Sequence, residues 1–324
     1  MILDAYATWN PRPRYVLLVG DGSFDPKRYR PDSTPTLIPP YLTHVDPYGE
    51  TAADNRYVTV DGNDDVPDLL IGRLPVKTLA ETQAVVNKIV QYETNPMPGG
   101  WIHNVTLVAD DADSGWSYAA DSDIIASTYL TPPLVVTRRY CAGVSPYVDD
   151  CLAQDAAAIH TQLLNDWSNG VLIMQYTGHS SWQQWALPQF FHLDDLPSLD
   201  NDHRWPIVLE MTCYTGAFQR PEPTLDEELV VRSNAGAVAT WGPTTLGKTN
   251  GHMALARGFY GAVFRATVST MGEATLAGKL ELASTGQNLD LLNTFVLLGD
   301  PATRFDRTVV PWAAQVYLPA VLRN

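Results

Sequence analysis

Val171-Leu-Ile-Met-Gln-Tyr-Thr-Gly-His179 is an apolar run that ends in glycine and histidine, and Pro206-Ile-Val-Leu-Glu-Met-Thr-Cys213 is a second such run that ends in cysteine. Runs that are apolar at nearly every position are typical of strands buried on both faces of a parallel sheet. The 34 positions from His179 to Cys213 are enough for the crossover that joins neighbouring parallel strands. Because reactive groups gather at the carboxyl ends of such strands, we expect the imidazole and the thiol to share one cleft.

The rest of the chain alternates strands and helices around these two runs. This alternation predicts an α/β fold with a mostly parallel central sheet flanked by helices. Strands are expected at residues 15–19, 68–72, 105–109, 134–137, 171–176, 207–211 and 235–240. Helices are expected at residues 78–92, 117–129, 153–167, 225–232, 252–260 and 270–283, and residues 291–298 close the core.

Three portions of the chain differ in character. Pro96-Met-Pro-Gly-Gly100 indicates a boundary near residue 100. Residues 1–100 hold only two clear core strands, so they are expected to be an incomplete α/β subdomain that completes a sheet or packs against the second half. Residues 101–305 are the expected catalytic subdomain. Residues 306–324 form a C-terminal tail, interpreted as an edge strand or a sorting tag because its apolar stretch is too short to span a bilayer.

Composition and charge exclude several classes of function. Apolar residues make up 45% of the chain and aromatic residues 10%, which is typical of a globular protein. The net charge of −15 argues against a nucleic-acid partner, since such binding depends on basic residues that neutralise phosphates. No stretch is long and apolar enough for a membrane span, and no signal peptide follows Met1. The chain is therefore either cytosolic or a fragment whose export signal lies upstream.

His179 and Cys213 are the residue types that a thiol peptidase needs. A free thiol has a pKa of about 8.5, so a nearby imidazolium is needed to raise its thiolate fraction at neutral pH. His179 would then donate a proton to the leaving amine. The backbone amides of Ser180 and Cys213 are in place to bind the oxyanion of a tetrahedral intermediate. A lone cysteine at a strand end more often serves packing, and only its pairing with His179 favours catalysis.

Six ordered segments resemble the gingipain family of cysteine peptidases, which belongs to clan CD. The likeness runs from about residue 10 to residue 305, and its segments are Arg14-Tyr-Val-Leu-Leu-Val-Gly-Asp-Gly-Ser-Phe-Asp25, Pro67-Asp-Leu-Leu-Ile-Gly-Arg-Leu-Pro75, Val86-Asn-Lys-Ile-Val-Gln-Tyr-Glu93, Tyr176-Thr-Gly-His179-Ser, Leu209-Glu-Met-Thr-Cys213 and Leu298-Gly-Asp-Pro301. The resemblance implies a caspase-like three-layer α/β/α sandwich and endopeptidase activity. It also implies Cys213 as the nucleophile, His179 as general acid or base, and a basic residue before the scissile bond.

The same resemblance implies an oxyanion hole and a substrate pocket. Relatives usually carry glycine directly after the catalytic histidine, whereas this chain carries Ser180, whose amide donates equally well if its backbone angles permit. The pocket is expected beside Thr240, Trp241 and Gly242, with Trp241 either as its wall or as a core residue. Trp182 is expected to line the cleft floor or to cap the following helix.

Cofactors and disulfides leave alternatives open. No cofactor is required, but Asp110-Asp-Ala-Asp113 and Asp61-Gly-Asn-Asp-Asp65 offer oxygen ligands for a structural Ca²⁺ of the kind that some relatives bind. Acidic side chains in loops are, however, more often simply exposed to solvent than bound to a metal ion. Cys141 and Cys151 either close a small disulfide loop or stay reduced, and both readings leave Cys213 unpaired.

Two hypotheses about function follow. The first is a secreted or cell-surface endopeptidase that acts on protein or peptide substrates, with a propeptide or upstream domain outside this chain. The cytoplasm is an alternative compartment for the same chemistry. The second hypothesis is a catalytically inactive peptidase-like module of a secreted or surface assembly, and it is motivated by Ser180.

Overall fold

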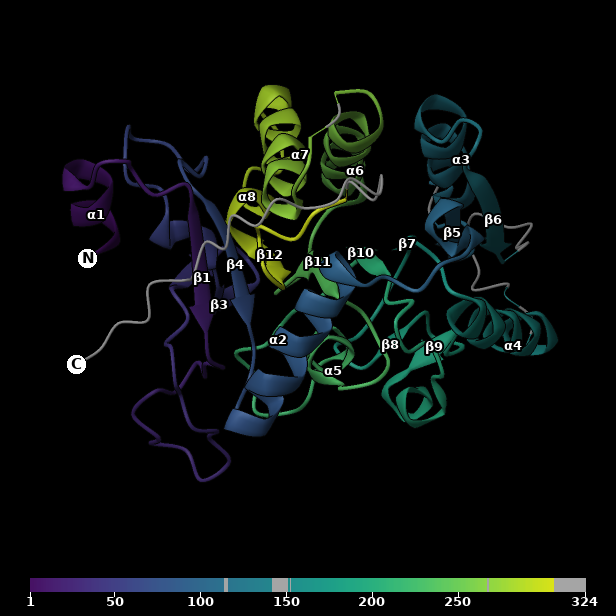
Figure 1. Ribbon diagram of the computed structural model, residues 1–324, viewed down its shortest axis with the longest axis horizontal. Coiled ribbons are helices and arrows are strands. Elements are labelled where there is room, and N and C mark those ends of the chain that lie inside the picture. Colours follow the sequence, from purple (N-terminus) through teal and green to yellow (C-terminus); the bar gives the residue numbers. More distant parts are fainter. Residues whose placement is uncertain (114–115, 142–150, 152, 267, 306–324) are drawn as a thin grey trace.

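An eight-stranded sheet forms the centre of the molecule (Figure 1). The computed structural model describes residues 1–113, 116–141, 151, 153–266 and 268–305. The strand order across the sheet is β1-β4-β12-β11-β10-β7-β5-β6. These strands are β1 (Tyr15–Val19), β4 (Leu70–Leu74), β5 (Asn104–Ala109), β6 (Val135–Tyr140), β7 (Ile173–Thr177), β10 (Ile207–Met211), β11 (Ala239–Pro243) and β12 (Phe295–Leu298).

The sheet is parallel within two blocks. β6, β5, β7, β10 and β11 pair in parallel with one another, and β12, β4 and β1 form a second parallel block. The blocks meet at the antiparallel pair β11 and β12, where Pro243 lies opposite Phe295. The predicted mostly parallel sheet is confirmed. The carboxyl ends of β7, β10 and β11 consequently lie at the edge of the sheet where β12 begins.

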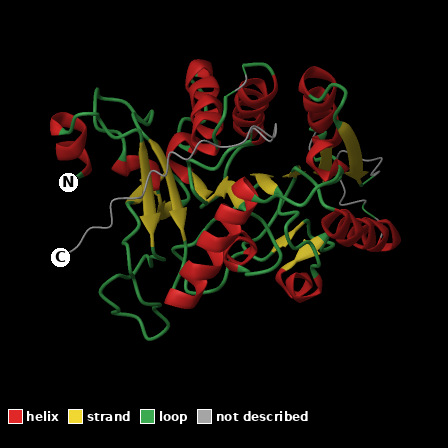
Figure 2. Ribbon diagram, in the orientation of Figure 1, coloured by secondary structure: helices red, strands yellow, loops and turns green. Residues whose placement is uncertain are grey.

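Helices cover both faces of the sheet (Figure 2). α3, α6 and α7 pack over one face, and α2, α4 and α5 lie on the other. This arrangement confirms the three-layer α/β/α sandwich. The helices are α1 (Ile2–Thr8), α2 (Leu79–Thr94), α3 (Tyr118–Tyr129), α4 (Ala153–Asn169), α5 (Leu225–Val231), α6 (Thr249–Phe264), α7 (Met271–Thr285) and α8 (Leu291–Thr294), with 3-10 turns at Asp54–Tyr57, Gly100–His103 and Leu193–Ser198.

Local sequence signals explain where these elements begin and end. The side chains of Thr78, Ser117 and Thr270 each accept a hydrogen bond from a backbone N–H in the first turn of α2, α3 and α7. Gly286 ends α7 in the left-handed conformation that glycine adopts most easily. Every residue of β7 and β10 is buried, as their apolar runs predict.

The first hundred residues complete the sheet, since β1 and β4 are two of its strands. They also form an antiparallel hairpin of β2 (Leu42–Val45) and β3 (Gly49–Ala52), which the sequence did not predict because its short strands mix polar and apolar residues. Thr51 on β3 donates a hydrogen bond to the carbonyl of Thr244, so the hairpin is anchored beyond the end of β11. The boundary at residue 100 stays a prediction.

Cys141 and Cys151 form a disulfide, which decides between the two alternatives for these residues. Cys213 is the free cysteine. The tail of residues 306–324, for which an edge strand or a sorting tag was predicted, lies outside the described residues. Within the described ranges, the helices are too short or too polar to cross a membrane.

Candidate active site

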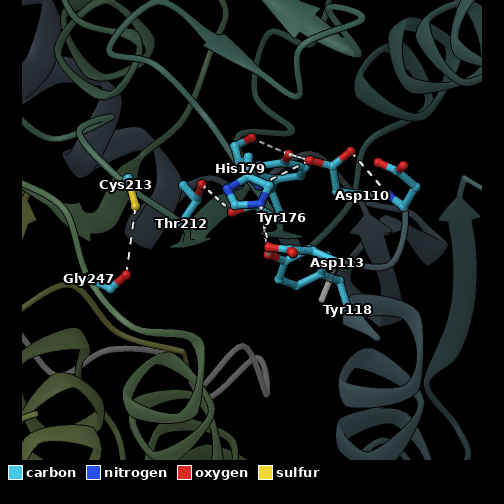
Figure 3. A network of polar contacts seen from close by, with 10 residues as sticks. Asp110, Asp113, Tyr118, Tyr176, His179, Thr212, Cys213 and Gly247 are labelled. Atoms are coloured by element: carbon cyan, nitrogen blue, oxygen red, sulfur yellow. Dashed lines mark hydrogen bonds and ion pairs between the residues drawn. The ribbon is translucent and has the colours of Figure 1, made fainter. Parts of the chain in front are cut away.

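His179 and Cys213 leave the sheet at the ends of adjacent strands. β7 and β10 pair in parallel, and Thr177 lies opposite Met211 at the last position of their register. Gly178-His179 and Thr212-Cys213 therefore emerge at the same level on the same edge (Figure 3). The crossover topology that the sequence indicated is the reason why the two side chains come from one edge.

The ring of His179 is held from one side by Asp113 and Tyr118. Its Nε2 lies 3.0 Å from Oδ2 of Asp113 and 3.2 Å from the hydroxyl of Tyr118 (Figure 3). The aromatic ring of Tyr118 also contacts the imidazole in an edge-to-face arrangement. The imidazole remains 64% exposed. Since Nε2 is engaged, Nδ1 is the ring nitrogen left to exchange a proton with a bound substrate.

The backbone of His179 is fixed by two buried groups. Oδ2 of Asp110 accepts hydrogen bonds from the His179 N–H at 3.0 Å and from the hydroxyl of Tyr176 at 3.1 Å. Burial raises the pKa of Asp110 to about 6, although the His179 N–H favours its charged form. Glycine is needed at 178 because a Cβ there would lie 2.4 Å from that of Asp110.

The backbone of Cys213 is hydrogen-bonded to the side chain of Ser180 through both its N–H and its carbonyl. Its backbone N–H donates to Oγ of Ser180 at 3.1 Å, and the Ser180 hydroxyl also contacts the Cys213 carbonyl. Oγ1 of Thr212 lies 2.6 Å from the same Ser180 oxygen. The Cys213 amide predicted for the oxyanion hole is therefore occupied by the side chain of Ser180.

The thiol itself is half-buried beside the segment that follows β11. Its Sγ lies 4.0 Å from the carbonyl oxygen of Gly247. Burial raises the pKa of the thiol above its usual value, so the neutral form is favoured at neutral pH. In the described structure the hydrogen-bond partner of Sγ is this carbonyl and not the His179 ring. The two side chains therefore lie at one edge of the sheet without a hydrogen bond between them.

The predicted pocket wall is not at the cleft. Trp241 is fully buried between Phe259 and Phe295, at centroid distances of 5.6 and 5.5 Å. Thr240 and Gly242 are buried as well. The core alternative for Trp241 is the one observed, because β11 is covered on both faces by helices.

Trp182 lies closer to the nucleophile. It is half-buried, with the guanidinium of Arg220 stacked 4.0 Å above its ring and Tyr214 against its edge. Tyr214 directly follows Cys213, and the place of Trp182 at the cleft floor stays a prediction. The second tryptophan of this loop, Trp185, is buried and stacks on Tyr176.

Glu210 lies on β10, is fully buried and does not reach the cleft. The indole N–H of Trp185 donates to its Oε1 at 3.0 Å. Burial and the neighbouring Asp226 raise the pKa of Glu210 well above its usual range, and burial raises the pKa of Asp226 to about 7. These shifts favour the neutral forms of both carboxyls.

Sequence reasoning missed the residues that hold His179. It quoted Asp110 and Asp113 only as candidate calcium ligands and did not single out Tyr118. The sequence feature that could have identified these residues is their position just after β5, a strand that pairs with β7. Calcium binding stays a prediction, and within the described ranges no three His, Cys, Asp or Glu side chains are grouped to hold a metal ion.

A thiol and an imidazole at the ends of neighbouring central strands of an α/β/α sandwich define the class of caspase-like cysteine peptidases of clan CD. The sequence model of peptidase family C25 matches residues 1–306. The chain belongs to this family, and the resemblance seen in the sequence is confirmed.

Its relatives include the gingipains of Porphyromonas gingivalis. Gingipain R2 of strain ATCC 33277 is 22% identical over 327 residues, which cover 94% of this chain but only 39% of the relative. Lys-gingipain of the same strain is 24% identical over 189 residues, or 57% of this chain and 10% of the relative. The chain thus spans about two-fifths or less of the length of these proteins.

Two solved structures share the fold. The crystal structure of the Arg-specific cysteine proteinase gingipain R superposes with a TM-score of 0.75 at 20% identity, over 94% of this chain and 66% of that one. The complex of the pro- and mature domains of RgpB from Porphyromonas gingivalis gives the same TM-score at 21% identity, over 93% of this chain and 68% of that one.

Proposed function

We propose that this chain is a cysteine endopeptidase with Cys213 as nucleophile and His179 as general acid and base. The observation that carries the proposal is the parallel pairing of β7 with β10, which brings the imidazole and the thiol to one edge of the sheet. Membership of peptidase family C25 supports the same chemistry.

In the first step Sγ of Cys213 attacks the carbonyl carbon of the scissile bond. The carbonyl oxygen becomes an oxyanion that the Ser180 and Cys213 amides would stabilise, once the Ser180 hydroxyl has moved off the Cys213 N–H. The C–N bond then breaks, and His179 passes a proton to the leaving amine. The thiol releases its proton to solvent as the thiolate forms, the imidazolium of His179 supplies the proton of the amine, and a thioester remains on Cys213.

In the second step water attacks the thioester carbonyl while His179 removes a proton from the water. The C–S bond breaks, the acid product leaves, and the thiol is restored. Asp113 contributes by holding the ring through Nε2 and by stabilising the imidazolium that forms in each step. Tyr118 acts with it as a positioning residue.

A basic residue before the scissile bond is the proposed preference. Two observations support it: the solved relative is an Arg-specific proteinase, and another relative is Lys-gingipain. The net charge of −15 also favours the approach of cationic peptides. The solved complex of pro- and mature domains supports a propeptide partner as part of this proposal.

Secretion or display at the cell surface is the proposed location. The disulfide between Cys141 and Cys151 supports it, because such bonds persist in oxidising compartments and are rare in the cytosol.

One observation favours the alternative of an inactive peptidase-like module. The Ser180 hydroxyl occupies the Cys213 amide, which an active enzyme must offer to the oxyanion. Burial also raises the pKa of the nucleophile, whose Sγ is hydrogen-bonded to the carbonyl of Gly247. Variants at Ser180 can therefore distinguish an active endopeptidase from an inactive peptidase-like module.

Replacement of Ser180 by glycine is expected to raise kcat/KM for peptide hydrolysis by about 5-fold. A neutral hydrogen bond has a net strength of about 1 kcal/mol, and its removal frees the Cys213 amide for the oxyanion. Ser180→Ala should show the same direction, whereas Ser180→Thr keeps the hydroxyl and should not. A fall in kcat/KM in both the glycine and the alanine variants would contradict the blocking role.

The proposed function is tested with fluorogenic peptides that carry Arg, Lys or Ala before the cleaved bond. Hydrolysis is expected, and iodoacetamide should abolish it in proportion to the mass label on Cys213. The labelling rate should rise as pH increases through 9, because burial raises the thiol pKa and thiolate forms on the alkaline side. Absence of hydrolysis with every peptide would favour the inactive module.

A further inference from the structure

A polar cavity lies beside the segment that touches the nucleophile. Its volume is about 500 Å³, and its walls come from the β2–β3 hairpin, the loop before β4, the start of α6 and the residues around α8. A second cavity of about 450 Å³ adjoins it through the shared residues Asp65 and Leu289. We refer to the two cavities together as the groove, and the proposed catalytic steps do not use it.

The groove is connected to Cys213 through a short stretch of backbone. The carbonyl of Gly247 lies 4.0 Å from Sγ of Cys213, and the next residue, Lys248, lines the first cavity. The stretch is held in place from both sides, since Tyr214 N–H donates to the carbonyl of Thr245 and Thr244 N–H donates to that of Thr294. A peptide that passes Cys213 along this stretch reaches the cavity within a few residues, at about 3.3–3.6 Å per residue.

The walls of the groove are predominantly acidic. Asp46, Asp65 and Asp290 line the first cavity from three different segments, and Asp64 lines the second. Two cations lie among them. Burial raises the pKa of Asp290, while the charge of Lys248 opposes this shift, and Arg56 is ion-paired with Asp65. The carboxylates outnumber the cations by two, on a chain that is itself acidic.

Two further features suit a long cationic side chain. Asn293 is only 7% exposed, its Nδ2 donates to Asp65 at 3.0 Å, and its Oδ1 makes no hydrogen bond within the described part of the chain. This amide oxygen is a buried acceptor next to an acidic wall. Leu289 is 41% exposed and Tyr48 half-buried, so they offer apolar surface to the methylene stem of an arginine or lysine.

From these observations we propose that the groove is a second subsite, which binds an arginine or lysine side chain located about two to four residues from the scissile bond. This side chain is distinct from the one that directly precedes the bond. The inference rests on the proposed peptidase function, because it assigns the groove to the same substrate. Since the contact is remote from the reacting atoms, it should contribute to binding of the substrate and so appear mainly in KM.

The test compares peptides of equal length in which one arginine, or one glutamine in its place, stands at each position two to four residues from the cleaved bond. At one or more positions the wild-type chain should prefer arginine by about 5-fold in kcat/KM, and 0.5 M NaCl should weaken the preference. The double variant Asp46→Asn/Asp290→Asn should reduce the arginine-to-glutamine ratio to less than about 2. The matched double variant Asp155→Asn/Asp200→Asn removes the same charge from exposed sites on α4 and before β10, and it should keep the ratio.

A binding measurement separates this inference from the proposed function. A fluorescently labelled peptide with the preferred arginine is titrated into the Cys213→Ala chain, with and without the Asp46→Asn/Asp290→Asn changes. A Kd that rises about 5-fold with these changes supports the subsite even if no peptide is hydrolysed, an outcome that would reject only the catalytic proposal. Equal affinity in both chains, or hydrolysis with no arginine preference at any position, would overturn the inference.

Discussion

Replacement of Cys213 by alanine is expected to lower kcat/KM for peptide hydrolysis by at least about 10³-fold while the chain stays folded. The nucleophile has no substitute, because Cys141 and Cys151 are joined in a disulfide. The fold should persist because Cys213 is only half-buried and its Sγ has a single weak contact to Gly247. The measurement is steady-state hydrolysis of a fluorogenic peptide, with the thermal midpoint of unfolding recorded for each variant.

His179→Ala should reduce hydrolysis nearly as far, and the double variant should show little further loss, since residues that act as a unit are not additive. His160 provides a matched control. It forms a similar pair with Asp195, at 2.8 Å, but lies on α4, away from the carboxyl end of β7. His160→Ala should leave hydrolysis within about 2-fold of wild type. A Cys213→Ala chain that retained more than a tenth of the activity would exclude this residue as the nucleophile.

Most central strands, their parallel direction and the adjacency of the two that carry His179 and Cys213 could be predicted from the sequence. Their apolar runs are long and their crossovers leave few alternatives, which is why His179 and Cys213 were placed at neighbouring strand ends. The reversal at β12 could not be predicted. Residues 291–298 are apolar except for Asn293 and Thr294, and nothing in this short stretch gives the direction of the strand that follows α8.

The candidate site was predicted only in part, for two physical reasons. Asp110, Asp113 and Tyr118 come from a third strand end, and their contacts to His179 depend on the spatial order of β5 and β7 rather than on sequence spacing. For Trp241 the sequence left two alternatives open, because an aromatic side chain at a strand end suits a cleft wall as well as a core. Only the packing of α6 against its ring distinguishes these cases.

Replacement of Arg73 by methionine is expected to lower the free energy of unfolding by about 3–5 kcal/mol. Arg73 lies on β4 and is 1% exposed. All five of its N–H donors are used: two reach the buried carboxylate of Asp54, and three reach the carbonyls of Gly20, Ile38 and Pro39. Methionine fills similar volume but leaves Asp54 as an uncompensated buried charge. Chemical denaturation followed by far-UV circular dichroism gives the change.

Two control variants distinguish an unpaired buried charge from lost packing as the cause of the lower stability of Arg73→Met. Arg138→Met removes an arginine from an exposed pair with Asp123, where both side chains are about half exposed, and should cost less than about 1 kcal/mol. Arg73→Met combined with Asp54→Leu removes both charges and should recover part of the loss, because the unpaired carboxylate is its main cause. If Arg73→Met and Arg138→Met lowered the free energy of unfolding equally, the guanidinium of Arg73 would not be the group that holds the loops of the first hundred residues to β4.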